Sequence, residues 1–120
     1  MYTDTEVLII GTGFAGLGMS IRLMQEGLTN FTVLEQAGEV GGTWRDNHYP
    51  GVACDVPSHL YSYSFEQNPR WSRLFAPQRE IFDYLKHCAD KYGVRPHIHF
   101  HSEVVKAVFD ERRGQWEVTT

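Results

Sequence analysis

The first 35 residues alternate between short apolar runs and one helical apolar stripe. Val7–Ile10 and Phe31–Leu34 are four-residue runs rich in apolar side chains, which is typical of strands in a parallel sheet. Between them, apolar residues recur at spacings of four, three and four, which places them on one face of a helix: Leu17, Ile21, Met24 and Leu28. A helix of this length fits a right-handed crossover, so residues 6–35 are predicted to form a βαβ unit.

The rest of the chain has a different pattern. Residues 36–76 show neither the helical nor the strand period, and such a long loop is either functional or a sign of a misassigned element. Pro77 opens a second helical stripe, and Gly93 is positioned to end it. Three further strands are predicted at residues 97–100, 104–109 and 116–119, with a hairpin turn at 112–115 between the last two. These elements predict an α/β, Rossmann-like fold: a parallel sheet with a βαβ unit, followed by a small antiparallel β-meander.

Composition and charge narrow the class of protein. With 120 residues, 42% hydrophobic and 22% charged, the chain is predicted to fold as one domain around one core. Eleven Lys and Arg against 15 Asp and Glu give a net charge of −4, which disfavours nucleic-acid binding. No apolar run approaches the about 20 residues that a membrane span needs. Two cysteines are too few for a disulfide scaffold, so a cytoplasmic protein is expected.

A glycine-rich turn lies between the first predicted strand and its helix. Residues 11–16 read GTGFAG, a GxGxxG motif in the strand–turn–helix context that dinucleotide binding requires. Gly11 permits the sharp turn, Gly13 lets the backbone approach a pyrophosphate, and Gly16 lets the helix lie close to the sheet. The alternative interpretation is a glycine turn without a ligand.

Glu35 follows the second predicted strand, nineteen residues after Gly16. A carboxylate here accepts hydrogen bonds from ribose hydroxyls and repels a 2′-phosphate, which favours FAD or NAD at this site. The alternative is a solvated glutamate at a strand end. The second glycine turn, GGTW at residues 41–44, is not needed for NAD and favours the longer FAD. The aromatic residues that follow either line a flavin ring or fill a core, and Phe75, Phe82 and Tyr84 are assigned to the core.

These motifs together resemble one family. GTGFAG at 11–16, Glu35, GGTW at 41–44 and especially YPGVACDVPS at 49–58 are similar to the N-terminal part of class B flavoprotein monooxygenases, and most similar to Baeyer–Villiger monooxygenases. The resemblance implies that residues 1–120 are the N-terminal part of an FAD-binding domain, with the NADPH-binding domain and the rest of the FAD domain outside this chain. Residues 45–48, RDNH, depart from the aromatic residues that many Baeyer–Villiger enzymes have there.

The same resemblance implies an activity. The full-length enzyme would use FAD, NADPH and O2 to insert one oxygen atom into a ketone, and residues 1–120 alone would be inactive. One alternative is a flavin monooxygenase that oxidises heteroatoms, or another flavin oxidoreductase with two dinucleotide sites. A second alternative is a stand-alone dinucleotide-binding module.

The resemblance also implies individual site residues. Asp55 would lie by the flavin and nicotinamide as a positioning group in catalysis, although it also reads as a turn-forming Asp. Tyr61 would lie beside the flavin, and the backbone of Val104 would contact the adenine. The full set of predicted cofactor-binding residues is Gly11, Gly13, Phe14, Ala15, Gly16, Glu35, Gln36, Gly42, Thr43, Trp44, Asp55, Tyr61 and Val104.

Three alternating histidines are the remaining candidate ligands. On a strand, His97, His99 and His101 would share one face, a geometry that metal sites use. No carboxylate or thiolate nearby completes a ligand set, so we predict that they face solvent, with Ile98 and Phe100 on the buried side, and that the chain binds no metal.

Overall fold

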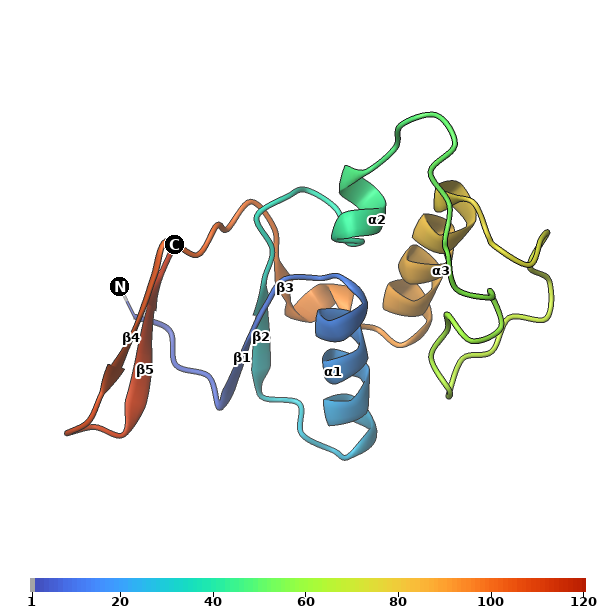
Figure 1. Ribbon diagram of the computed structural model, residues 1–120. Coiled ribbons are helices and arrows are strands. Elements are labelled where there is room, and N and C mark those ends of the chain that lie inside the picture. The colour runs from blue at the N-terminus through green and yellow to red at the C-terminus, as the bar shows by residue number, and fades with distance from the viewer. Residues whose placement is uncertain (1) are drawn as a thin grey trace.

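A parallel sheet of three short strands organises the computed structural model, which describes residues 2–120 (Figure 1). Its strand order is β1 (Val7–Ile10), β2 (Phe31–Leu34) and β3 (Ile98–His99). Helix α1 (Phe14–Gln25) connects β1 to the parallel strand β2, as the hydrophobic pattern predicts. The predicted βαβ unit and the Rossmann-like fold class are therefore confirmed.

The register of the sheet brings two strand ends to the same edge. Ile10 at the end of β1 pairs with Leu34 at the end of β2, and the Gly11 N–H continues the ladder by donating to the Leu34 carbonyl at 2.8 Å. Gly11 and Glu35 therefore leave the sheet side by side. In open α/β sheets, ligands bind at this carboxyl edge.

Both long helices end in the same glycine motif. After α1, Gly27 has a φ of +81°, and the Leu28 N–H donates to the Leu23 carbonyl at 2.9 Å. This Schellman motif brings Leu28 back onto the core although it lies beyond the helix. Helix α3 (Gln78–Lys91) is followed by Gly93 with a φ of +69° and ends in the same way, close to the predicted boundary.

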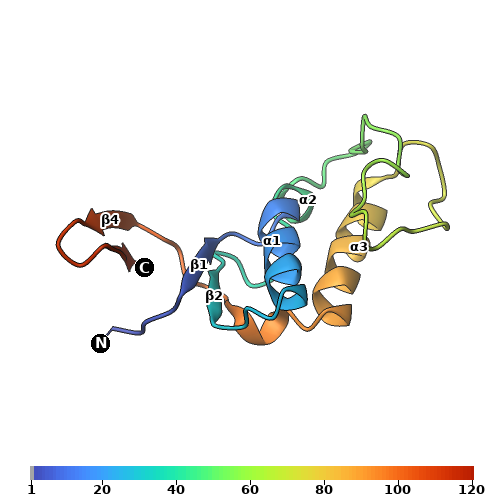
Figure 2. The same ribbon diagram turned by 90° about the horizontal axis from the view of Figure 1, so that it is seen from below.

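The core lies between the sheet and the two long helices. Figure 2 shows the C-terminal hairpin of residues 106–119, the sheet, α1 and α3 following one another across the molecule. Helix α1 contacts both β1 and β2 on one side and α3 on the other. The largest fully buried side chains include Leu17 and Ile21 of α1, Val33 of β2, and Ile81 and Leu85 of α3. No helix among residues 2–120 is long and apolar enough to cross a membrane.

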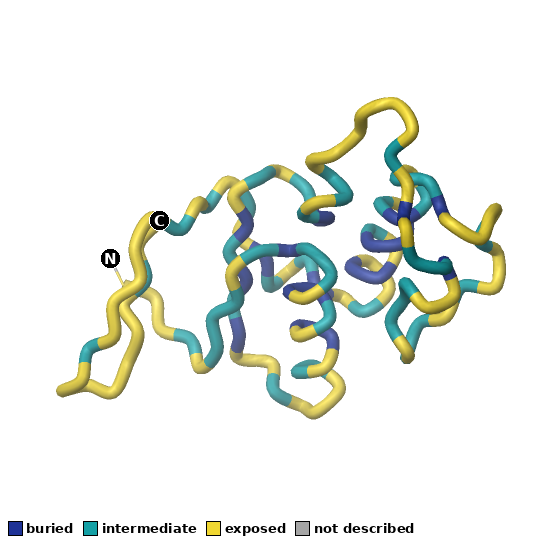
Figure 3. The backbone as a smooth tube through the Cα atoms, in the orientation of Figure 1, coloured by how far each residue is buried: buried dark blue, intermediate teal, exposed yellow. Residues whose placement is uncertain are grey.

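The antiparallel part has two strands, so the predicted three-stranded meander is wrong. Strands β4 (Lys106–Asp110) and β5 (Gln115–Thr119) form an exposed hairpin beside the sheet (Figure 3). The segment predicted as the first strand of the meander instead supplies β3, which pairs parallel with β2. Burial of Ile98 beside Val33 favours this position, since the hairpin offers no buried surface.

The three histidines do not share a strand face, which corrects that part of the prediction. His97 belongs to a 3-10 helix, η1 (Arg95–His97), and its ring stacks on Phe31 at 4.1 Å between centroids. His99 is exposed on β3, and His101 has a φ of +54° in the turn that follows. Residues 2–120 hold no group of three or more side chains placed to share a metal ion.

Aromatic packing holds the long segment 36–76 in place. The Tyr63 hydroxyl donates to the Phe14 carbonyl at 2.6 Å, and the Tyr63 N–H donates to the Tyr84 hydroxyl at 2.9 Å. These side chains, with Phe65 and Trp71, pack against α1 and α3. Tyr84 is buried as predicted, and Phe82 is partly buried. Phe75 is 43% exposed, so its assignment to the core is wrong.

Candidate functional site

A cleft of about 320 Å³ opens at the carboxyl edge of β1 and β2. Its walls come from the glycine turn, the end of β2, the short helix α2 (Thr43–Asp46) and the segment 102–104. The cleft brings together seven of the predicted site residues: Gly11, Gly13, Glu35, Gln36, Gly42, Thr43 and Val104. Segments far apart in the sequence therefore meet at the edge where an α/β sheet binds its ligand.

The glycines of the first turn have distinct steric roles. Gly11 has a φ of +95°, a conformation that L side chains rarely adopt. A Cβ on Gly16 would lie 2.0 Å from the Gly11 carbonyl oxygen, so only glycine lets α1 start this close to the strand. A Cβ on Gly13 would meet only the Cα of Gly42, at 3.8 Å. The packing of the protein itself therefore does not require glycine at position 13, and the absence of a side chain there leaves open space on the cleft side.

The second glycine turn lies against the first. The Gly41 N–H donates to the Thr12 carbonyl at 2.9 Å, and a Cβ on Gly42 would lie 3.0 Å from the Gly13 Cα. No side chain caps the N-terminus of α1, whose first N–H groups have no acceptor within the helix. The two turns thus form a backbone cradle in front of a positive helix end, which suits an anion such as a phosphate.

Glu35 is buried, which excludes the solvated alternative. Its side chain is 3% exposed. Oε2 accepts the Thr12 N–H at 3.0 Å and also the Thr12 hydroxyl, while Oε1 accepts the Ala37 N–H at 2.9 Å. Burial raises the pKa of Glu35, but the hydrogen bonds from Thr12 and Ala37 and the charge of Arg45 outweigh it and hold the pKa below its ordinary value. The carboxylate is therefore ionised at neutral pH.

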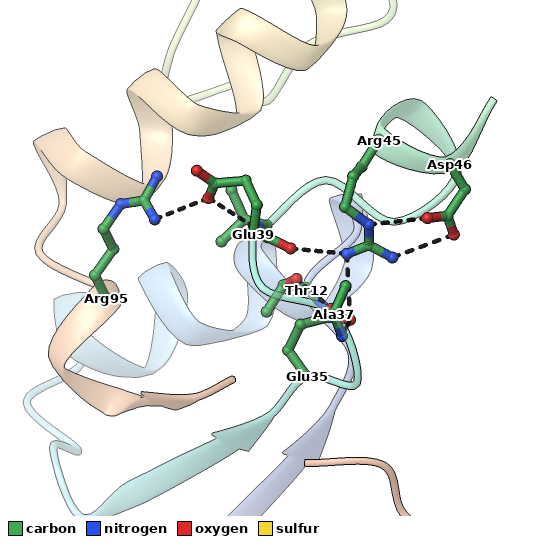
Figure 4. A network of polar contacts seen from close by, with 8 residues as sticks. Thr12, Glu35, Ala37, Glu39, Arg45, Asp46 and Arg95 are labelled. Carbon is green, nitrogen blue, oxygen red and sulfur yellow. Dashed lines mark hydrogen bonds and ion pairs between the residues drawn. The ribbon is translucent and has the colours of Figure 1, made fainter. Parts of the chain in front are cut away.

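Several polar residues that the sequence motifs do not assign to the site also line the cleft, namely Thr12, Arg45, Asp46, Ser102 and Glu103, and Arg45 is the cation among them. Its Nη1 lies 3.2 Å from Glu35 Oε1 and donates to the Glu39 carbonyl at 2.8 Å, while Nε donates to Asp46 at 2.9 Å (Figure 4). In the sequence, residues 45–48 stand out only as a departure from the family pattern. The available signal was charge, since Arg45 is one of two basic residues in the first 60.

The other predicted residues lie outside the lining of the cleft. Phe14 and Trp44 each pack edge-on against Tyr61, with ring centroids 4.8 and 5.7 Å apart, and the Trp44 Nε1 donates to the Tyr61 hydroxyl at 3.0 Å. Ala15 and Gly16 belong to the first turn of α1. Asp55 is exposed in the long segment, next to buried Cys54. The structure thus groups Trp44 with Tyr61 and keeps Asp55 apart from the cleft.

This fold and cleft define a class of protein. The chain belongs to the family of NAD(P)-binding Rossmann-like domains, whose family model matches residues 9–77. It is also 55% identical over all 120 residues to a Baeyer–Villiger monooxygenase of Streptomyces coelicolor. The resemblance to Baeyer–Villiger monooxygenases that the glycine and YPG motifs indicate is therefore confirmed.

Solved structures agree with this relationship. A steroid monooxygenase bound to NADP superimposes with a TM-score of 0.90 at 43% identity over 97% of this chain. The protein OTEMO in complex with FAD and NADP gives a TM-score of 0.88 at 33% identity over 99% of this chain. The chain spans only 23% of the length of each of these three proteins. It therefore corresponds to one part of them, the FAD-binding region.

Proposed function

We propose that the cleft holds the ADP half of FAD. The backbone cradle at the start of α1 would receive the pyrophosphate, with Gly13 and Gly42 leaving room for it. Glu35 and Gln36 would face the adenosine ribose, and the backbone of Val104 would contact the adenine. The observation that carries this proposal is a buried, ionised carboxylate beside a glycine cradle at one carboxyl edge.

To bind a ribose hydroxyl, Glu35 must give up one of its hydrogen bonds or ion-pair contacts within the protein. A carboxylate offers about four acceptor sites. Thr12 fills two of them, Ala37 fills one, and Arg45 lies against the fourth. A ribose hydroxyl would therefore replace the Thr12 hydroxyl or the Arg45 N–H as a donor. Both groups line the cleft, so either can turn to the ligand instead.

The flavin half of the cofactor would extend from this cleft toward Trp44 and Tyr61. Trp44 follows Thr43, which lines the cleft, and the Trp44–Tyr61 hydrogen bond fixes both rings relative to the second glycine turn. Asp55 lies further along the same segment and is exposed, so it is available to position a group outside this chain. Bound FAD would supply the redox chemistry between a reduced nicotinamide and O2, and this chain would bind and orient the cofactor.

For the full-length protein, we propose an NADPH-dependent monooxygenase that inserts an oxygen atom into a ketone. The support is the similarity of the entire chain to a Baeyer–Villiger monooxygenase and to structures that hold NADP or FAD with NADP. Residues 1–120 would form the first part of the FAD domain. The described residues, 2–120, present one dinucleotide cleft, so we expect no substrate-dependent NADPH consumption from this chain alone.

The test uses the protein that carries this chain at its full natural length. We expect it to purify with FAD and, given NADPH and O2, to convert a panel of cyclic and linear ketones to esters. Oxidation of sulfides with no ester product would favour the heteroatom-oxidising alternative. A colourless protein that gains no flavin absorbance when FAD is added would contradict the cofactor assignment.

A further inference from the structure

An ion pair inside the cleft carries an inference that rests on the proposed dinucleotide site. Arg45 and Glu35 both line the cleft, with side chains 14% and 3% exposed and with 3.2 Å between Nη1 and Oε1 (Figure 4). Within the described chain, Arg45 is the only cation in the cleft lining, which also holds the carboxylates of Asp46 and Glu103. Charges of both signs therefore lie together at the ribose end of the site.

The hydrogen bonds of Arg45 within the protein leave part of its guanidinium free to donate to a ligand. A guanidinium has five N–H groups. The Nε–H and one N–H of Nη2 donate to the Asp46 carboxylate, at 2.9 and 3.1 Å. Nη1 donates to the Glu39 carbonyl and faces Glu35. One N–H of Nη2 has no partner among residues 2–120, and the N–H that faces Glu35 would be released if Glu35 lost its charge.

We propose that the Glu35–Arg45 pair decides whether the cleft accepts a 2′-hydroxyl or a 2′-phosphate on the adenosine ribose. In Rossmann sites a carboxylate binds the ribose hydroxyls, whereas a nearby arginine accommodates the 2′-phosphate. This cleft holds both groups. The carboxylate sets the preference because it occupies Nη1 of the arginine, and because Asp46 and Glu103 keep the lining negative. Arg45 could thus bind a phosphate, but its ion pair with Glu35 prevents this.

The test measures two competitors for FAD in the flavin-free, full-length protein. The competitors are 5′-AMP and adenosine 2′,5′-bisphosphate, which differ only in the 2′-phosphate. FAD binding is followed by flavin fluorescence, and the readout is the inhibition constant of each competitor against FAD. Binding of a competitor at another nucleotide site does not enter this constant. The proteins are the wild type, Glu35→Gln, Arg45→Met and the double variant, where Met keeps the volume of the arginine stem without its donors.

We expect the wild type to prefer 5′-AMP by about tenfold or more, the effect that one charge-assisted hydrogen bond supports. Glu35→Gln should shift this ratio toward the bisphosphate by about tenfold. The double variant should lose that shift, because no guanidinium remains to bind the phosphate. Arg45→Met alone should shift the ratio further toward 5′-AMP, because Glu35 is then no longer neutralised.

In the Glu35→Gln series, two results would overturn the inference. The first is an unchanged ratio in Glu35→Gln, and the second is a shift of the same size whether or not Arg45 is present. If Glu35→Gln fails to fold, Arg45→Met decides alone, and an unchanged ratio there refutes the role of Arg45. A wild type that binds no FAD overturns the proposed function, and this inference with it. If the wild type binds FAD but Arg45→Met leaves the ratio of the two inhibition constants unchanged, only the inference is overturned.

Discussion

Replacing Gly16 by Ala should destabilise the fold, because α1 starts so close to the strand that precedes it. The new Cβ would lie 2.0 Å from the Gly11 carbonyl oxygen and 2.9 Å from the Gly11 carbonyl carbon, both of them backbone atoms. Overpacking of this kind costs about 1–3 kcal/mol, and a backbone obstacle places the cost at the upper end of that range. Alanine recovers up to about 1 kcal/mol of helix propensity. The expected net loss is therefore about 2 kcal/mol.

The control is Gly18→Ala, two residues further along the same helix. There the Cβ would meet Cε1 of the Tyr63 ring at 2.9 Å, a side-chain atom, whereas at Gly16 it would meet a backbone carbonyl. The helix-propensity gain is the same, so Gly18→Ala should remain within about 1 kcal/mol of the wild type.

The assay is urea unfolding of the flavin-free, full-length protein, followed by circular dichroism. For a typical urea dependence of about 1–3 kcal/mol per molar, the Gly16→Ala midpoint should fall by roughly 1 M. A Gly16→Ala protein that is as stable as Gly18→Ala would show that the approach of α1 to β1 does not require glycine.

Two further predictions concern the packing of the segment 36–76. The hydrogen bond from Lys91 lowers the pKa of Glu66 to about 2. The ionised carboxylate therefore stabilises the fold above its ordinary pKa, and this stabilisation is lost as the pH falls from about 5 toward 2. Glu66→Gln should accordingly flatten the decline of the urea midpoint over that pH range. Tyr63→Phe removes the donor to the Phe14 carbonyl and should lower the unfolding free energy by about 0.5–1.5 kcal/mol, whereas Tyr49→Phe, at an exposed position, should leave it unchanged.

The first half of the fold follows from local patterns in the sequence. A four-residue apolar run, a glycine turn and a helical stripe each depend on neighbouring residues, so β1, α1 and β2 lie where the sequence predicts them. Leu28 continues the apolar stripe without being helical, because the Schellman motif returns it to the core. Periodicity therefore locates the buried face of the helix better than its end.

The errors occur where pairing between distant segments decides the structure. Strand β3 is only two residues long, and it exists because Ile98 finds a place beside Val33 of β2. Nothing within residues 97–100 distinguishes that partner from the adjacent hairpin. Local sequence can propose a strand there, but the buried neighbour determines the sheet that it joins.

In the candidate site, too, the residues of one local unit could be predicted, whereas a residue brought in by tertiary contacts could not. Gly11, Gly13 and Glu35 belong to one continuous βαβ unit, and their meeting follows from its geometry. Arg45 reaches Glu35 only because the second glycine turn folds back onto the first, through the Gly41–Thr12 hydrogen bond. That contact depends on tertiary structure, so spacing in the sequence does not reveal it.

The proposed FAD site requires a pyrophosphate to lie against Gly13, and the experiment for this contact is FAD titration of the flavin-free, full-length Gly13→Ala variant. Gly13 has a φ of −75°, which alanine adopts freely, and the added Cβ would meet only the Gly42 Cα at 3.8 Å. The variant should therefore fold and melt like the wild type. Its methyl group would occupy the ligand side of the cradle, so its FAD affinity should fall by at least about tenfold, or 1.4 kcal/mol. A Gly13→Ala protein of unchanged FAD affinity would contradict the account.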